Sequence, residues 1–442
     1  PDEARWAEMA REMWVEGEWL AVQLNGLWQW QYPPAHVWLS AISWGLFGDE
    51  GARFPSVLAS FITALIVGIG GLRLFGYRTG LYASLLFASS PLVVILGHWQ
   101  TPDSAWMGWL TLSWMAIMCG QQAHLTPAQR RTLLWLAWTS AALATLTGGL
   151  ASLGLLSATV IIYAVWQHDL CLPRQLYWRS GLAIYAVLVL PWLLAMSQRF
   201  EGFATFFLRD LPFNADSVSD LPAGDTWWVL LLTLGLGGLP WWLLFGMRAP
   251  VAPTHGIFAP TRWLWTWVIV STSFLLLAHH QAASRVLIVM PALCLLLAWR
   301  LAHAGTRGLY WLGVGLLATG LFSAGFADRL CELLLANVHE SAPGAVRPWL
   351  QIGGILLASG ALMAMLLSRF NQHGLTITSL ALSLLLCSLA GLGGYARVAA
   401  ENSSAGLAPA AKRYTHMWTT VYSVGLFDAS EIGRASCRER VS

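Results

Sequence analysis

Twelve apolar runs dominate this sequence, and each is close to the length that a helix needs to cross about 30 Å of hydrocarbon. A backbone in lipid must satisfy its own hydrogen bonds, so such runs are expected to be helices. Only 11% of the residues are charged and 57% are hydrophobic, whereas a soluble chain carries about 25% charged residues. The runs lie at 54–75, 80–97, 104–120, 132–147, 148–166, 180–197, 227–246, 263–279, 285–302, 308–326, 348–368 and 375–395. The sequence therefore predicts an all-α polytopic membrane protein with about twelve transmembrane helices.

Charges in the connecting loops predict the orientation. If residues 1–53 face outward, alternate loops place a large set of arginines on the cytoplasmic side, joined there by one acid, Asp169. This distribution follows the positive-inside rule. An outward first segment also requires a span before Pro1, so one more helix is expected upstream. The cytoplasmic arginines are Arg73, Arg78, Arg130, Arg131, Arg174, Arg179, Arg248, Arg262, Arg300, Arg307 and Arg369.

Four segments follow from this topology. Residues 1–53 form a first periplasmic loop, with one helix from Asp2 to Glu16 and an interfacial helix from Ala35 to Phe47. Residues 54–395 form the bundle, which includes a second outer loop at 198–226. Residues 396–430 are expected to begin a periplasmic C-terminal domain. Residues 431–442 read as a translated sequencing adapter or, alternatively, as a disordered basic tail.

Three acids on the outer side are candidates for chemistry. Asp2 and Glu3 open the first helix, and Asp103 follows Pro102 at the start of a span. Each placement has an ordinary explanation, because acids favour the positive end of a helix dipole. However, all three lie on one membrane face at the mouth of an apolar bundle, where ionisable groups are costly and usually functional. Such a carboxylate suits a general base.

Outer-face cations and polar groups beside these acids are candidates for binding an anionic substrate. Individually, each arginine also fits an interfacial anchor. We expect no metal site, because the adjacent His279 and His280 point in different directions on a helix and the six cysteines form no CxxC pair. A net charge of +3 gives no reason to expect nucleic acid. The substrate-binding candidates are Arg5, Tyr32, Arg53, His98, Arg209 and Arg285, with Arg199 as a further cation.

The segment PDEARWAEMAREMWVEGEWLAVQLNGLWQWQYPPAHVWLS resembles the first outer loop of the lipid A aminoarabinose transferases and of bacterial protein O-mannosyltransferase-like enzymes, which belong to the GT-C glycosyltransferase superfamily. The segments GHWQTPDSAWMGW and VLPWLLAMSQRFEGFATFFLRD resemble later parts of that family in the same order, and the resemblance covers about residues 1–305. It implies a polyprenyl-phosphate sugar donor, inversion at the sugar, a periplasmic active site in the bacterial inner membrane, and thirteen spans before a periplasmic domain. The family's catalytic aspartate falls on Asp2, and its second-loop aspartate falls on Asp103.

Three lysines of the family are replaced in this chain. Glu-Lys-Pro-Pro becomes Gln31-Tyr32-Pro33-Pro34, and Leu-Thr-Lys-Gly becomes Leu146-Thr147-Gly148-Gly149. Ser-Lys-Leu-Pro-Tyr-Tyr becomes the stretch from His280 to Arg285. Either arginines such as Arg209 and Arg285 bind the phosphate instead, or the substrate differs, or activity is lost.

We therefore expect an inverting glycosyltransferase that moves a sugar from a polyprenyl-phosphate donor to lipid A, a glycan or a protein. Asp2 is expected to be the general base, and Glu3 and Asp103 are expected to support it. The alternatives are a flippase for a lipid-linked sugar, or a catalytically degenerate relative. A transporter should carry ionisable residues near the midplane, whereas here the acids gather at one face.

Overall fold

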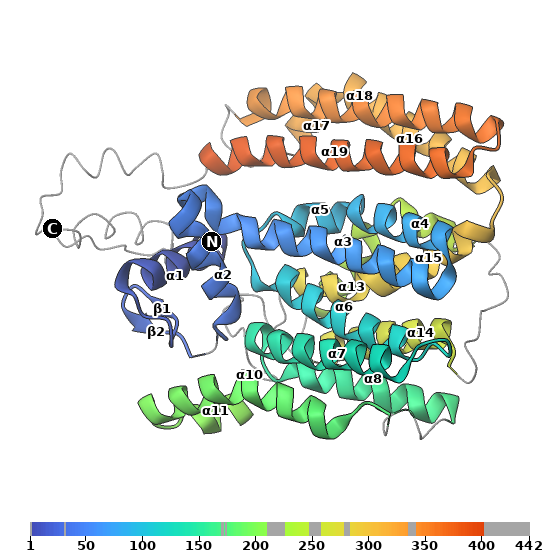
Figure 1. Cartoon of the computed structure of the whole chain (residues 1–442). Coiled ribbons are helices and arrows are strands. Elements are labelled where there is room, and N and C mark those ends of the chain that lie inside the picture. The colour runs from blue at the N-terminus through green and yellow to red at the C-terminus, as the bar shows by residue number, and fades with distance from the viewer. Residues whose placement is uncertain are drawn as a thin grey trace, which may run out of the picture.

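The long helices of this chain run roughly parallel to one another, and a small N-terminal unit covers one end of the bundle (Figure 1). The computed structural model describes residues 2–30, 32–168, 172, 175–209, 226–246, 258–277, 283–334 and 342–401. The all-α architecture is confirmed for these residues. Of the expected segment 396–430, only the part through Glu401 is described, as the end of α19. The segment 431–442 and the pair His279-His280 lie outside the described residues.

Each of the twelve apolar runs contains helix, with described turns or breaks at 89–90, 149–150, 238–240 and 326. The elements are α3 (Phe54–Phe75), α4 (Tyr77–Ala88), α5 (Pro91–Gly97), α6 (Pro102–Gly120), α7 (Pro127–Gly148), α8 (Ala151–Gln167), α10 (Trp178–Arg199), α11 (Phe203–Arg209), α13 (Thr226–Gly237), η2 (Trp241–Gly246), α14 (Pro260–Leu277), η3 (Ala283–Val289), α15 (Met290–His303), α16 (Arg307–Gly325), α17 (Ala327–Leu334), α18 (Ala342–Arg369) and α19 (His373–Glu401).

Six of the described helices are long and apolar enough to cross a membrane by themselves, and a seventh is added if α4 and α5 form one bent span. The six are Gly51–Phe75, Trp178–Arg199, Ser284–His303, Arg307–Gly325, Val346–Arg369 and His373–Val398. The remaining helices are shorter or less apolar. Length and composition therefore establish a polytopic chain but do not by themselves give the number twelve.

Two of the expected continuous spans are broken, which corrects the prediction. The run 80–97 bends by 57° between α4 and α5, where Pro91 begins the second helix and lacks the N–H that would continue the first. The run 227–246 divides between α13 and η2 around Pro240. The predicted break near Gly149 is confirmed, because this residue ends α7 with a φ of 78°.

Contacts between loops distinguish the two ends of the bundle. At the end that we call the Arg73 end, Gln122 Nε2 donates to Arg73 O at 2.5 Å, and Arg262 donates to Gln167 Oε1 at 2.8 Å. Arg300 there donates to Phe245 O at 2.6 Å. The opposite end carries the N-terminal unit and Asp103, and we call it the Asp103 end. Loops that the predicted topology places on the same side of the membrane therefore contact one another, as expected if successive loops alternate between the two sides.

The N-terminal unit has a small core of its own. α1 (Asp2–Glu16) and α2 (Ala35–Phe47) have the predicted bounds, and a two-stranded hairpin, β1 (Gln23–Leu24) and β2 (Leu27–Trp28), lies between them. An apolar stripe of α1 is buried: Trp6 is 9% exposed, Met9 0% and Met13 3%. This stripe packs against the hairpin and α2, so the first loop is a folded unit.

Glu12 fixes the turn of this hairpin. Asn25 and Gly26 have positive φ values of 54° and 74°, as the two central residues of a type I′ turn require. Their backbone N–H groups donate to the Glu12 carboxylate at 2.7 and 3.5 Å. Burial of Glu12 nevertheless raises the pKa of its carboxyl.

Two polar contacts attach the N-terminal unit to α10. Trp192 Nε1 donates to Leu20 O at 3.0 Å, and Arg199 donates to Glu18 Oε2 at 2.7 Å. The Arg199 guanidinium also lies 4.9 Å from the centroid of the Trp28 ring. Arg199 is therefore occupied in attaching the first loop to α10, which argues against the phosphate-binding role considered for it.

The Glu18–Arg199 pair predicts a pH dependence of stability. Burial raises the pKa of Glu18, but hydrogen bonds from Arg199 and Leu20 outweigh it, and the net pKa falls below its ordinary value of 4.5. The stabilisation should therefore be present above about pH 4.5 and be lost as the pH falls through the folded-state pKa. In detergent, the melting temperature of the wild type should exceed that of Glu18→Gln at pH 7, and the gap should close toward pH 3. The exposed Glu201→Gln control should show no such gap, and a gap that stays constant with pH would contradict the assignment.

Candidate active site

Asp103 lies in the first turn of α6, which begins at Pro102. Its side chain is nearly buried, with the residue 6% exposed. The N-terminus of a helix favours a carboxylate, because the dipole there is positive. The predicted placement at a helix start is confirmed. Asp103 is also more buried than an acid that serves only at the N-terminus of a helix.

Ser284 and Arg285 of η3 hold this carboxylate from across the bundle. The Ser284 hydroxyl donates to Asp103 Oδ2, and Arg285 Nε lies 3.8 Å from Asp103 Oδ1. The Arg285 side chain is only 16% exposed. The structure therefore joins two predicted site residues, Asp103 and Arg285, that are 182 positions apart in the sequence.

Trp106, one turn after Asp103, supports Arg285. The guanidinium carbon lies 5.7 Å from the centroid of the Trp106 ring, within the range of a cation–π contact. The Trp106 indole donates to Ser152 Oγ at 2.7 Å, and Ser152 donates to Ala144 O at 2.9 Å. The arginine thus rests on a ring that is fixed by α7 and α8.

Trp106 leaves no room for a side chain at position 148, where the family resemblance implies a lysine. A Cβ atom at Gly148 would overlap the Trp106 indole. Trp106 is 2% exposed. A side chain at position 148 is therefore incompatible with this placement of Trp106.

Glu3 connects the N-terminal unit to the loop before α6. Its Oε1 atom accepts from Gln100 N at 3.3 Å and lies 2.8 Å from Arg53 Nε. Gln100 precedes Asp103 by three residues, so the two Cα atoms are at most about 11 Å apart. Glu3 and Asp103 therefore lie at the same end and close together, as predicted, while Arg53 is exposed and paired with Glu3.

Arg5 and Tyr32 form a second polar contact on the N-terminal unit. The Arg5 guanidinium donates to Tyr32 Oη at 3.2 Å. The Trp6 ring packs edge-on against Tyr32 at 4.7 Å and against His36 at 5.7 Å. Burial lowers the pKa of His36 to about 4, so this imidazole is neutral near pH 7. Tyr32, at a position where the family resemblance implies a lysine, thus presents an oxygen to Arg5.

Among the described side chains, the structure shows none of the remaining predicted site residues, His98, Arg209 and Asp2, in contact with Asp103, Glu3 or Arg5. His98 Nδ1 donates to Val94 O at 2.6 Å, so its ring turns back onto α5. Arg209 ends α11 and Asp2 begins α1, but their side chains lie outside the described part of the structure. Within that part, no three His, Cys, Asp or Glu side chains form a group that could hold a metal.

Three buried polar atoms around Asp103 have no hydrogen-bond partner among the described residues. They are Gln100 Nε2, Thr101 Oγ1 and Ser104 Oγ, in residues that are 1%, 8% and 0% exposed. Buried polar groups are normally satisfied by protein, water or ligand. The sequence does not single out these residues, Ser284 or Trp106, because they are uncharged and lie within or beside apolar runs, as packing residues do.

The contact between Asp103 and Ser284 predicts a coupling in stability. Ser284→Ala and Asp103→Ala should each lower the unfolding free energy, and the double mutant should lose less than the sum by about 1 kcal/mol, because they remove one interaction. The measurement is a double-mutant cycle by denaturant unfolding in detergent. Ser284→Ala combined with the exposed, distant Glu332→Ala is the control and should be additive. Additivity of the first pair would contradict the contact.

This chain is similar in sequence to several known proteins. Residues 31–194 match the family described as dolichyl-phosphate-mannose-protein mannosyltransferase. An undecaprenyl phosphate-alpha-4-amino-4-deoxy-L-arabinose arabinosyl transferase of Pseudomonas aeruginosa is 29% identical over 383 residues, 84% of this chain and 67% of that protein. A protein of the same description from Sodalis glossinidius is 31% identical over 310 residues, 67% of this chain and 54% of its own length. The chain thus spans about two thirds or less of these relatives.

The fold gives an independent comparison. It matches ArnT of Cupriavidus metallidurans in the apo state with a TM-score of 0.86 and 23% identity, over 98% of this chain and 79% of that one. With undecaprenyl phosphate bound, the same protein matches with a TM-score of 0.87 and 24% identity, over 98% and 80% of the two chains. The expected resemblance is confirmed: the chain has the GT-C fold and is similar, in sequence and in structure, to the aminoarabinose transferases.

Proposed function

We propose that this protein is an inverting glycosyltransferase that moves a sugar from a polyprenyl phosphate to an acceptor at the Asp103 end of the bundle. The observation that carries the proposal is the buried Asp103–Ser284–Arg285 cluster, which lies beside the Glu3–Gln100 contact. It combines carboxylates and a half-buried cation at the mouth of an apolar bundle. These three features suit a lipid-linked sugar phosphate. The apolar bundle accommodates the polyprenyl chain, the cation binds the phosphate, and a carboxylate lies near the sugar.

The reaction follows from these groups. An acceptor oxygen attacks the anomeric carbon from the face opposite the phosphate, and the bond between that carbon and the phosphate oxygen breaks. The electron pair leaves with the polyprenyl phosphate, and the acceptor proton passes to a carboxylate. We assign this proton to Asp2, with Glu3 beside it, and the leaving phosphate to Arg5, Arg285 and Arg209. Nearby carboxylates also stabilise positive charge that develops on the sugar.

Asp103 takes a supporting role in this assignment. Its carboxylate accepts from Ser284 and lies near Arg285, which suits a group that orients the arginine toward the phosphate. Tyr32 orients Arg5 in a comparable way. Arg53 and His98 lie at the rim, where Arg53 is exposed, and contribute to binding rather than to the chemistry.

We further propose that all twelve helical runs cross the membrane and that the Asp103 end faces the periplasm of a bacterial inner membrane. The contacts at the Arg73 end support the alternation, and the arginine excess there supports the orientation. The transferases of Pseudomonas aeruginosa and Sodalis glossinidius carry undecaprenyl phosphate in their description, and ArnT of Cupriavidus metallidurans binds it in a crystal. The acceptor is a periplasmic lipid, glycan or protein, with lipid A the one that the family resemblance implies.

The carboxylates give the first test of this function. Asp2→Asn and Asp103→Asn in the full-length protein should each lower the transfer rate by about 100-fold or more, because a base or an oriented cation is lost in the transition state. The assay follows labelled sugar from a polyprenyl-phosphate donor in membranes. Asp49→Asn is the control, because Asp49 lies in the same N-terminal unit but accepts from Trp44 Nε1 at 2.9 Å. Wild-type transfer by Asp2→Asn would contradict the assignment of the base.

The arginines give a second test, which separates binding from chemistry. Arg5→Gln should raise the donor KM about tenfold or more, because a charged hydrogen bond to phosphate contributes about 1.5–3 kcal/mol. Tyr32→Phe should have a smaller effect of the same kind, since it removes only the oxygen that orients Arg5. Arg11→Gln is the matched control, because Arg11 on the same helix is paired with Glu8 at 2.8 Å. An unchanged donor KM in Arg5→Gln would exclude Arg5 from the phosphate site.

A further inference from the structure

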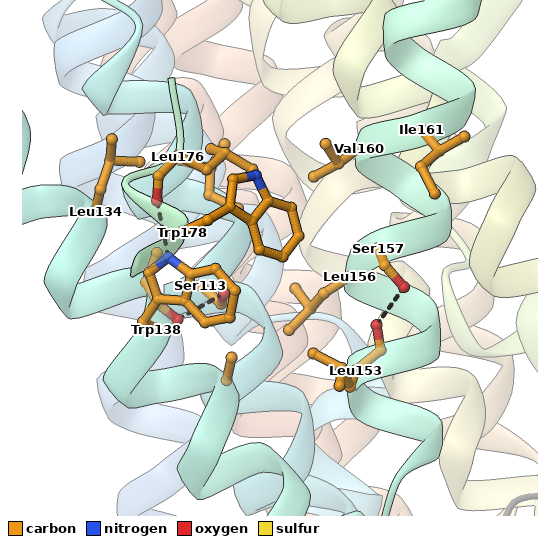
Figure 2. Close-up of a pocket in the computed structure, with 13 residues that line it drawn as sticks. Ser113, Leu134, Trp138, Leu153, Leu156, Ser157, Val160, Ile161, Leu176 and Trp178 are labelled. Atoms are coloured by element: carbon orange, nitrogen blue, oxygen red, sulfur yellow. Dashed lines mark hydrogen bonds between the residues drawn. The ribbon is translucent and has the colours of Figure 1, made fainter. Parts of the chain in front are cut away.

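A groove between α6, α7 and α8 is lined by none of the residues of the candidate active site (Figure 2). Its volume is about 90 Å³, and its floor includes Leu134, Leu156 and Val160, which are 0%, 5% and 4% exposed. An apolar cavity of about 150 Å³ stays dry and accepts a benzene ring. The groove is therefore large enough for a few carbon atoms of a hydrocarbon chain.

The polar groups of the lining are already satisfied within the protein. Ser113 Oγ donates to Ala137 O at 3.0 Å, Ser157 Oγ donates to Leu153 O at 2.6 Å, and Trp138 Nε1 donates to Leu176 O at 2.9 Å. Figure 2 shows these hydrogen bonds as dashed lines. The surface offered to an occupant is thus hydrocarbon and aromatic rings, which suits an alkyl chain and not a sugar.

The groove opens toward lipid, on the Arg73 side of the candidate active site. Ile161 and Trp178 at its edge are 57% and 45% exposed. The lining runs along α8 from Leu153 to Ile161, a length of about 12 Å at 1.5 Å per residue. Ser113 lies ten residues beyond Asp103 on α6, a rise of about 15 Å along that helix. On α8 the lining begins at Leu153, the residue after Ser152, whose hydroxyl accepts from the Trp106 indole.

Positive charge borders this groove. The Arg131 guanidinium lies 5.1 Å from the centroid of the Trp135 ring, one turn from Trp138 of the lining, and Trp135 Nε1 donates to Ser180 Oγ at 3.0 Å. Arg179 is exposed and directly follows Trp178. Asp169 is the only acidic residue between Ser104 and Phe200. An anionic headgroup would therefore find two arginines and little repulsion.

We propose that this groove binds one acyl chain of an anionic phospholipid from the leaflet at the Arg73 end, with the headgroup beside Arg131 and Arg179. The chain occupies the space along α8, and Trp135 and Trp178 lie at the headgroup level, as interfacial tryptophans do. This site is separate from the donor site proposed above, and it does not depend on the catalytic assignment.

The test uses a phosphatidylglycerol with a diazirine in its acyl chain, incorporated into nanodiscs with the full-length protein. After irradiation, peptides that cover residues 134–161 should carry the label, and an otherwise identical phosphatidylcholine probe should label them several-fold less. Ser157→Phe fills the groove and should abolish this labelling. Ile162→Phe is the matched control on the exposed face of the same helix and should label as the wild type does. Arg131→Gln should weaken the preference for the anionic probe about fivefold, the expected contribution of one arginine near an anionic surface.

Three outcomes would overturn the proposal. Equal labelling by the two probes would contradict the headgroup contact. Undiminished labelling of Ser157→Phe, in a variant that still elutes as a monodisperse protein, would contradict binding in the groove. If Ser157→Phe fails to fold, the comparison of wild type with Arg131→Gln decides by itself. Competition by equimolar unlabelled undecaprenyl phosphate would assign the groove to the donor chain and would also contradict the proposal.

Discussion

The Asp103 carboxylate sets the constraint on which this end of the molecule depends. A charge that is almost buried destabilises the fold unless other groups compensate it, and here the compensation comes from distant parts of the chain. Ser284 and Arg285 of η3 reach it, Arg285 rests on Trp106, and Trp106 is held by Ser152 of α8. The N-terminal unit joins the same region through Glu3 and Gln100. One buried carboxyl group thus connects α6, η3, α8 and the first loop around a single site.

Much of the fold could be predicted from the sequence, because hydrophobic length and charge placement are local properties. The bounds of α1 and α2, the break at Gly149 and the gathering of Glu3, Asp103 and Arg285 at one end followed from them. The bends near Pro91 and Pro240 were missed, since an apolar run that contains proline still looks like one span. Ser284, Trp106 and Gln100 were also missed, because their roles depend on which helices become neighbours, and no local pattern marks a serine that will contact a distant carboxylate.

The alternatives to an enzyme lose support for specific reasons. A transporter commonly places ionisable groups at broken helices near the midplane, but at the α4–α5 break the described side chains Ser89, Ser90 and Trp241 are uncharged, and the Trp241 indole donates to Ser89 Oγ at 3.1 Å. A degenerate relative should have lost its lysines without structural compensation. Instead, Tyr32 accepts from Arg5, and Arg285 lies beside Asp103. The replacements are integrated into the site.

The close contact between Gly148 and Trp106 restricts how this protein could have diverged from its relatives. Each residue is acceptable only because of the other: the indole fills the volume that a side chain at position 148 would need, and it supports the arginine that faces Asp103. A side chain could be introduced at position 148 only together with a smaller residue at 106, and that change would remove the ring beneath Arg285. Positions 106 and 148 are therefore expected to tolerate substitution only as a pair.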